Sequence, residues 1–102
     1  MKNYIPDRWV VLKITDPESN QSIEKVFAGW YGGYAGNDSW KLNSGITKIT
    51  ETNKQFEFLG ETGSTYICYK SAYGMSLYMA GVLEYWKKHS TAIFEILESY
   101  NV

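Results

Sequence analysis

Cysteine, histidine and arginine each occur once in this chain of 102 residues, as Cys68, His89 and Arg8. A single cysteine cannot form an intramolecular disulfide, so the chain is not a disulfide-stabilised secreted scaffold. One thiol and one imidazole cannot supply the three or four ligands of a zinc site. The acidic residues lack the spacing of a calcium-binding loop, so we expect neither a metal nor a cofactor.

Long hydrophobic runs are also missing. Lys13, Glu84 and Lys87 interrupt the most apolar segments, and none approaches the roughly 20 apolar residues that span a bilayer. The first residues, MKNYIPDRW, lack the apolar core of a secretory signal. Together with the single cysteine, these absences predict a cytoplasmic protein with no membrane segment.

Neither sign of charge dominates, since 10 lysines and arginines stand against 11 acidic residues and the net charge is −1. Nucleic-acid binding depends on clustered cations, and the only adjacent pair here is Lys87 and Lys88, so a nucleic-acid partner is disfavoured. With 44% hydrophobic and 17% aromatic residues, the chain can bury one core. We therefore predict a single domain over residues 1–102.

Five segments have the alternation and the β-branched or aromatic content of strands. They are residues 8–15, 23–31, 40–50 with a bend at Ser44 and Gly45, 55–60 and 65–70. The turn residues Asp16 and Pro17 separate the first two segments. Because the connections are too short for parallel crossovers, we predict an antiparallel meander of about five strands over residues 8–70.

The hydrophobic period changes after Ser71. Six residues then share one face of a helix, which we expect to pack on the sheet: Met75, Tyr78, Met79, Val82, Leu83 and Trp86. A second helical stretch follows around residues 91–100, unless one helix of about 27 residues runs through; we favour a break near Ser90. The predicted fold class is α+β, an antiparallel sheet packed against one or two C-terminal helices within residues 72–100.

The opposite face of the first predicted helix carries Leu77, Ala80, Gly81 and Tyr85. Two large apolar side chains beside two small residues suit a contact between helices of two subunits. A homodimer through this face is therefore one expectation.

Catalysis has little support in the sequence. A nucleophilic pair of Cys68 and His89 would require a tertiary contact that spacing cannot show. We interpret Cys68, in the middle of a predicted strand, as a core residue. His89 follows two lysines where a helix is expected to end, so we interpret it as a favourable charge at the helix C-terminus. We expect no catalytic residue, and an enzyme of unknown reaction is the third-ranked hypothesis.

The most unusual segment is GWYGGYAGND, residues 29–38, which lacks the lysine and the following helix of a phosphate-binding loop. Its glycines give backbone freedom, and six recognition-type residues lie in or beside it: Trp30, Tyr31, Tyr34, Asn37, Asp38 and Trp40. Aromatic rings offer large contact area at low entropic cost, and Asn or Asp can orient a partner. We predict that these residues bind a protein; the alternative is a small molecule such as a nucleotide or a sugar. A structural role for Trp30 and Trp40 beside a hairpin loop stays open.

The strings GWYGGYAGNDSWKLNSGITKI and SAYGMSLYMAGVLEYW, within residues 29–86, resemble small uncharacterised proteins of tailed bacteriophages and prophages. The resemblance implies no activity and no site residues. It implies a context, because small phage proteins without enzymatic motifs often inhibit a host protein or counter a host defence. We therefore expect a phage-derived, non-catalytic accessory protein that binds a host protein in the host cytoplasm through the aromatic Gly-rich loop.

Overall fold

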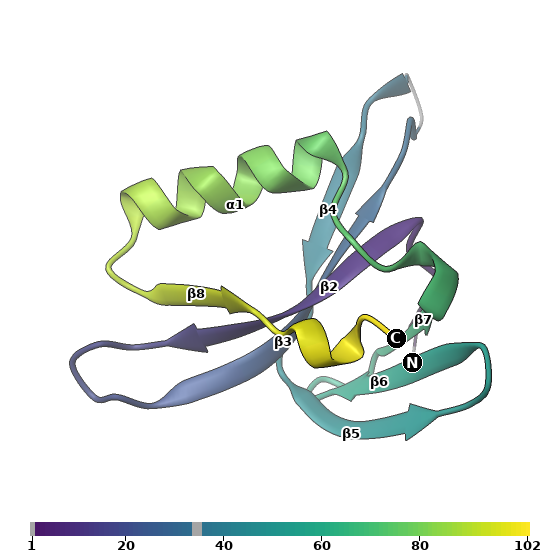
Figure 1. Ribbon diagram of the computed structural model, residues 1–102, viewed down its shortest axis with the longest axis horizontal. Coiled ribbons are helices and arrows are strands. Elements are labelled where there is room, and N and C mark those ends of the chain that lie inside the picture. The colour runs from purple at the N-terminus through teal and green to yellow at the C-terminus, as the bar shows by residue number, and fades with distance from the viewer. Residues whose placement is uncertain (1, 34–35) are drawn as a thin grey trace.

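The computed structural model describes residues 2–33 and 36–102. Within these ranges, eight strands form two four-stranded sheets, and one α-helix packs against one of them (Figure 1). The predicted α+β class, an antiparallel sheet packed against a C-terminal helix, is confirmed. None of the helices in the described ranges has the length and apolar character needed to cross a membrane.

The two sheets are built from different parts of the chain. The first has the order β1 (Asn3–Tyr4), β7 (Thr65–Tyr69), β6 (Gln55–Gly60), β5 (Ile46–Glu51). The second has the order β4 (Ser39–Leu42), β3 (Ser22–Trp30), β2 (Arg8–Thr15), β8 (Ile93–Ile96). The helical elements are η2 (Lys70–Ala72), α1 (Leu77–His89) and η3 (Glu98–Tyr100). Neighbouring strands are antiparallel except β1 and β7, which are parallel.

The predicted strands at residues 8–15 and 55–60 coincide with β2 and β6. The predicted strand at residues 40–50 is divided into β4, which pairs with β3, and β5, which pairs with β6. The chain leaves one sheet and enters the other between them, where Gly45 has φ +137°, a conformation that glycine adopts without strain. The expected single meander is therefore shared between two sheets.

The prediction of a second helix over residues 91–100 was wrong, and so was the alternative of one long helix. Ile93–Ile96 form β8, which pairs with β2 from Leu12↔Ile96 to Thr15↔Ile93, and only η3 is helical beyond it. A short apolar run fits both the helical and the strand period. Here the run forms a strand because β2 offers it backbone hydrogen bonds. The first helix ends at His89, near the expected break, and Ser76 caps its start by accepting a hydrogen bond from the Met79 amide at 3.2 Å.

Strand β2 is buried on both faces because the second sheet lies between α1 and the first sheet (Figure 1). Toward the first sheet, the strands of the second sheet contribute Trp9, Val11, Val26 and Ala28, which meet Phe56, Phe58, Tyr66 and Cys68. Toward α1 they contribute Val10, Leu12 and Phe27, which meet Met79 and Leu83. The continuous apolar run in β2 is thus explained by a strand in the middle layer of three.

Trp9 connects the two sheets. Its side chain is fully buried, and its indole Nε1 donates a hydrogen bond to the Tyr69 carbonyl at 2.7 Å. Its ring lies 5.9 Å from the Phe56 ring and 5.1 Å from the Tyr73 ring, edge to face in both pairs. The buried indole donor is satisfied, so Trp9 contributes both apolar area and a fixed spacing between the sheets.

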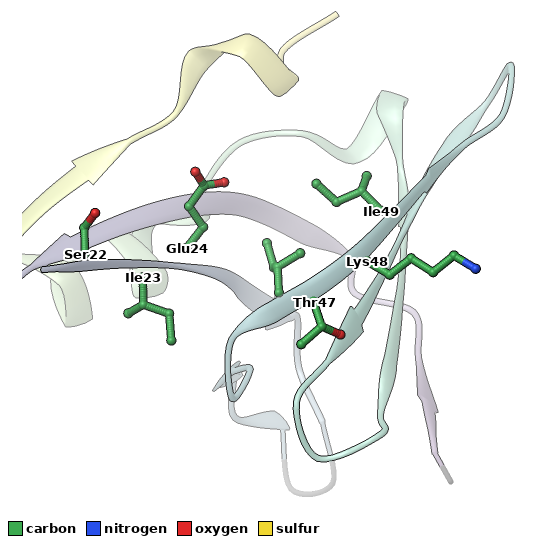
Figure 2. A pocket seen from close by; sticks show the side chains of 7 residues that line it. Ser22, Ile23, Glu24, Thr47, Lys48 and Ile49 are labelled. Carbon is green, nitrogen blue, oxygen red and sulfur yellow. The ribbon is translucent and has the colours of Figure 1, made fainter.

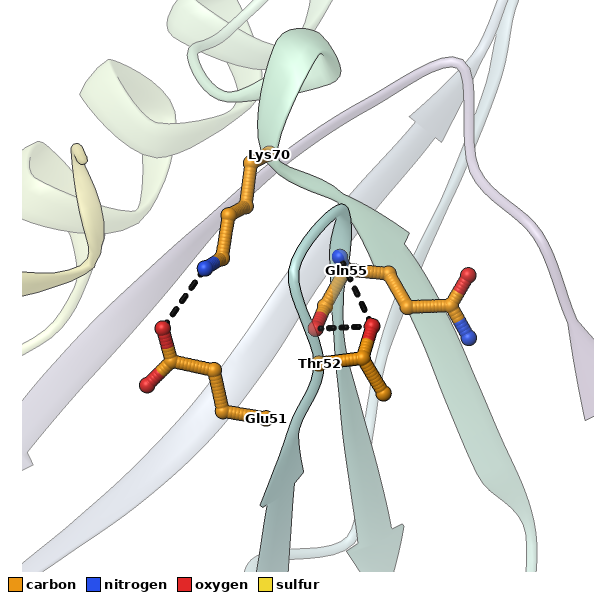
Figure 3. Close-up of polar contacts among 4 residues, drawn as sticks. All are labelled: Glu51, Thr52, Gln55 and Lys70. Carbon is orange, nitrogen blue, oxygen red and sulfur yellow. Dashed lines mark hydrogen bonds and ion pairs between the residues drawn. The ribbon is translucent and has the colours of Figure 1, made fainter.

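The turn between β5 and β6 is closed by polar contacts (Figure 3). The Thr52 hydroxyl accepts from the Gln55 amide and donates to the Gln55 carbonyl, each at 3.3 Å. Nearby, the Lys70 ammonium lies 2.6 Å from the Glu51 carboxylate. Since Glu51 is exposed, this ion pair contributes little stability.

A methyl group added at Gly29 and one added at Gly81 should have opposite effects on the stability of the protein. A Cβ on Gly29 would lie 2.4 Å from the Met79 sulfur, whereas a Cβ on Gly81 would meet no atom within 4 Å. We expect Gly29→Ala to lower the free energy of unfolding by about 1–3 kcal/mol, because the buried methionine must shift. Gly81→Ala should raise it by about 0.5–1 kcal/mol through helix propensity. Urea unfolding of both variants checks this; equal stability of Gly29→Ala and the parent would contradict the packing of α1 on β3.

Candidate functional site

The hairpin of β3 and β4 carries most of the residues predicted to bind a partner, and hydrogen bonds hold its base in place. The Trp30 indole Nε1 donates to the Ile5 carbonyl at 2.9 Å. The Tyr31 amide donates to the Asp7 carboxylate at 2.9 Å, and the Gly32 amide donates to the Asp38 carboxylate at 2.8 Å. Trp30 and Asp38 therefore have structural contacts that join the hairpin to the segment between β1 and β2 and close its loop.

The two predicted tryptophans project from opposite faces of the hairpin. Trp30 pairs with Ser39, and Trp40 pairs with Gly29 in the next register position, so their side chains alternate. Trp30 contacts the ring of Tyr4 edge to face at 6.3 Å. Trp40 packs on the α1 side instead, with its ring 5.0 Å from that of Trp86.

Two of the other residues predicted to bind a partner, Tyr31 and Asn37, are exposed. Tyr31 is 54% exposed. Asn37 is exposed as well, and its carbonyl accepts the Gly33 amide at 2.7 Å. Tyr34 lies outside the described residues. The structure thus brings Trp30, Tyr31 and Asp38 together at the base of the loop and places Trp40 on the other side of the hairpin.

Strand β4 is an edge of its sheet, with β3 as its only partner among the described strands. The carbonyl of Val26 on β3 accepts the Asn43 amide at 3.0 Å, whereas the carbonyl of Gly29 faces away from β4 and accepts the Asp7 amide. Because backbone groups alternate in direction along a strand, the amides and carbonyls of Trp40 and Leu42 point to the open side of β4.

A hollow lies on each face of this open edge. One, of about 510 Å³, is lined by Asn3, Tyr4, Ile5, Trp30, Ser39, Trp40 and Lys41. The other, of about 450 Å³, is lined by Trp40, Leu77, Tyr78, Gly81, Val82, Tyr85 and Trp86. Trp40 lines both because β4 separates them. We call the open edge of β4 together with these two hollows the β4 surface.

Three large apolar side chains of α1 are exposed at the β4 surface: Leu77 at 94%, Tyr85 at 61% and Tyr78 at 43%. The sequence pattern identified Leu77 and Tyr85 as an apolar helix face but connected them with a homodimer and not with the Gly-rich hairpin. It assigned Tyr78 to the core, although this residue lies in the first turn of α1 beside the sheet edge. Only the tertiary arrangement places these side chains beside Trp40.

A further hollow, of about 530 Å³, lies between the start of β3 and β5 (Figure 2). Ile23 and Ile49 are 38% and 42% exposed in it, and Figure 2 shows the side chains of Glu24 and Lys48 pointing in different directions. Its polar groups do not converge on one point, so this hollow is a weaker candidate for a binding site than the β4 surface.

The thiol and the imidazole lie in different environments. Cys68 is fully buried between the two sheets, and this burial raises the pKa of its thiol far above the usual value. His89 is exposed in the last turn of α1, where its ring lies 4.3 Å from that of Tyr85. Cys68 is therefore confirmed as a core residue. In the described ranges, no three His, Cys, Asp or Glu side chains are grouped in a way that could hold a metal ion.

Comparisons of the chain with protein-family models, with curated proteins and with solved structures returned no match.

The buried thiol gives a direct prediction. Because Cys68 is inaccessible and its raised pKa keeps it protonated, a thiol reagent should react with the native protein only as fast as the protein opens, and immediately in denaturant. Labelling with an aromatic disulfide reagent at neutral pH measures this. Rapid labelling of the native protein would contradict the burial of Cys68 and would restore the thiol as a candidate nucleophile.

Proposed function

We propose that this chain is a non-catalytic accessory protein that binds an extended segment of another protein along strand β4. The single observation that supports this most strongly is an open strand edge with an apolar hollow on each of its faces. The phage-like sequence pattern makes a host protein the partner we expect, with inhibition of that protein or evasion of a host defence as the outcome of binding.

The geometry of the β4 surface matches the requirements of strand addition. An added strand would form backbone hydrogen bonds with the outward amides and carbonyls of Trp40 and Leu42, and its side chains would alternate between the two faces. One set would enter the hollow beside Trp30, and the other set would enter the hollow beside Tyr85. Main-chain pairing supplies affinity in this mode, while the two hollows supply selectivity.

The partner segment should carry bulky apolar or aromatic residues at alternate positions. Both hollows are lined by aromatic rings, and exposed Leu77 and Tyr85 offer further apolar area at the rim. Burial of such area at about 25 cal/mol per Å² provides the driving force. The net charge of −1 gives no long-range attraction to nucleic acid.

Two other occupants of the β4 surface are outcomes that the same experiments distinguish. A second copy of the chain, bound through the helix face of Leu77 and Tyr85 as the sequence suggested or paired β4 to β4, would give a homodimer and a concentration-dependent mass in sedimentation. A nucleotide or a sugar in the hollow beside Trp30 would change tryptophan fluorescence without any peptide present. Either result would replace the proposed partner.

The test uses a randomised library of ten-residue peptides selected on the immobilised protein. We expect enriched peptides with alternating apolar residues. Tyr85→Asp should weaken their binding by about tenfold or more, because it places a charge in one of the two hollows. Ile93→Asp is the matched control, since Ile93 is also exposed, at 56%, but lies on β8 at the opposite edge of the sheet.

The melting temperature of each variant should be measured beside its affinity. Equal loss of binding in both variants, or selected peptides that bind Tyr85→Asp as tightly as the parent, would contradict the β4 surface as the binding site. A selection that enriches no alternating pattern would contradict strand addition itself.

A further inference from the structure

A further hollow lies where the chain crosses from the second sheet to the first. The segment 43–45, which joins β4 to β5, meets the turn between β6 and β7. The Ser44 hydroxyl accepts the Thr62 amide at 3.1 Å, and the Gly45 carbonyl accepts the Glu61 amide at 3.0 Å. A hollow of about 290 Å³ lies at this junction, and it shares only Tyr4 with the hollow beside Trp30.

Hydrogen-bond donors dominate the lining of this hollow. Its polar side chains are tyrosines, serines, a threonine, an asparagine and Lys25, and no carboxylate is among them. Each of these side chains can donate a hydrogen bond, and Lys25 is the only charged residue in the lining. A site of this composition favours a group with several acceptor atoms and negative charge.

Asn43 provides the most specific feature. It is 3% exposed, the one buried polar residue of the described core. Its Oδ1 accepts the Val26 amide at 2.8 Å, which sets the orientation of the side-chain amide. Its Nδ2 is buried and has no hydrogen-bond partner. Leaving such a donor unsatisfied costs about 1–3 kcal/mol, and an acceptor atom beside it would recover that cost.

The space next to this donor depends on Gly60. A Cβ on Gly60 would lie 3.2 Å from Asn43 Nδ2 and 3.0 Å from Ser44 Oγ. The backbone of Gly60 is outside the left-handed region, so its conformation does not itself demand glycine. Gly60 also lines the hollow, and a side chain at this position would crowd the unpartnered donor.

We propose that this hollow binds a small oxyanion, either a phosphoryl group or a carboxylate, with Asn43 Nδ2, Lys25 and the neighbouring hydroxyls as its donors. Tyr66 is one of those hydroxyl residues. Burial, followed by its neighbours Tyr4 and Cys68, raises the pKa of the Tyr66 phenol; a phenol is protonated at neutral pH even without this shift and can donate a hydrogen bond. The proposal does not depend on the function assigned to the β4 surface.

The experiment is a titration of ¹⁵N-labelled protein, followed through the side-chain amide resonances of Asn43. Inorganic phosphate and acetate are added separately, and chloride at matched ionic strength is the control. We expect a saturable shift with phosphate or acetate, and the tighter of the two identifies the oxyanion class. Linear, non-saturating shifts like those with chloride would overturn the proposal.

Variants locate the site. Gly60→Ala should weaken binding by about tenfold or more, because its methyl group fills the space beside Asn43. Gly81→Ala, which adds the same group where no atom lies within 4 Å, should bind like the parent. A folded Gly60→Ala variant with parental affinity would overturn the proposal.

The charge contribution is tested independently by Lys25→Met, with Lys48→Met as its matched control. Only Lys25→Met should lose affinity for the oxyanion. This comparison tests the proposal even if Gly60→Ala does not fold. Parental affinity of Lys25→Met, or equal losses in both lysine variants, would overturn the assignment of this hollow.

Discussion

The burial of β2 and β3 on both faces is the constraint on which the rest of the structure depends. A strand covered on one side by a helix and on the other by a sheet needs apolar residues at successive positions, and Trp9, Val10, Val11 and Leu12 supply them. The backbone of β2 must also be paired on both edges, because water cannot reach it. Strand β3 pairs with one edge and β8 with the other, which explains why the C-terminal residues form a strand.

This arrangement leaves β4 and β8 as the two edges of the second sheet. Strand β4 has aromatic side chains of Trp30, Trp40 and Trp86 around it, which distinguishes it from the charged and polar ends of the hairpin of β2 and β3. Natural proteins normally protect an edge strand with charge, proline or a covering segment. The retention of apolar surface beside an unpaired edge is therefore the physical basis for assigning a binding role to it.

The sequence predicted local structure well where one period was clear. The alternation of Phe56, Glu57 and Phe58 indicated a strand with one buried face, and both phenylalanines are buried. It predicted less well where short segments satisfy two periods, as at Ile93–Ile96, because the choice between helix and strand depended on a distant partner. The division of residues 40–50 between two sheets had a local signal in Gly45, but that signal identified a bend and not a change of sheet.

The sequence indicated only part of the candidate site, because the rest of the site depends on tertiary contacts. The aromatic composition of the Gly-rich hairpin was visible in the sequence, but the opposite orientations of Trp30 and Trp40 follow from the register of β4 on β3. The proximity of Tyr85 to Trp40 follows from the packing of α1. Asn43 gave no sequence signal at all, since its orientation depends on a tertiary contact in which its Oδ1 accepts the Val26 amide, and its Nδ2 has no partner.

Amide hydrogen exchange along β4 tests the central claim most directly. In the free protein, the amide of Lys41, which faces β3, should exchange slowly, while those of Trp40 and Leu42 should exchange rapidly from the open edge. In complex with a selected peptide, Trp40 and Leu42 should become protected. Slow exchange of these two amides in the free protein, or unchanged rapid exchange in the complex, would contradict strand addition at β4.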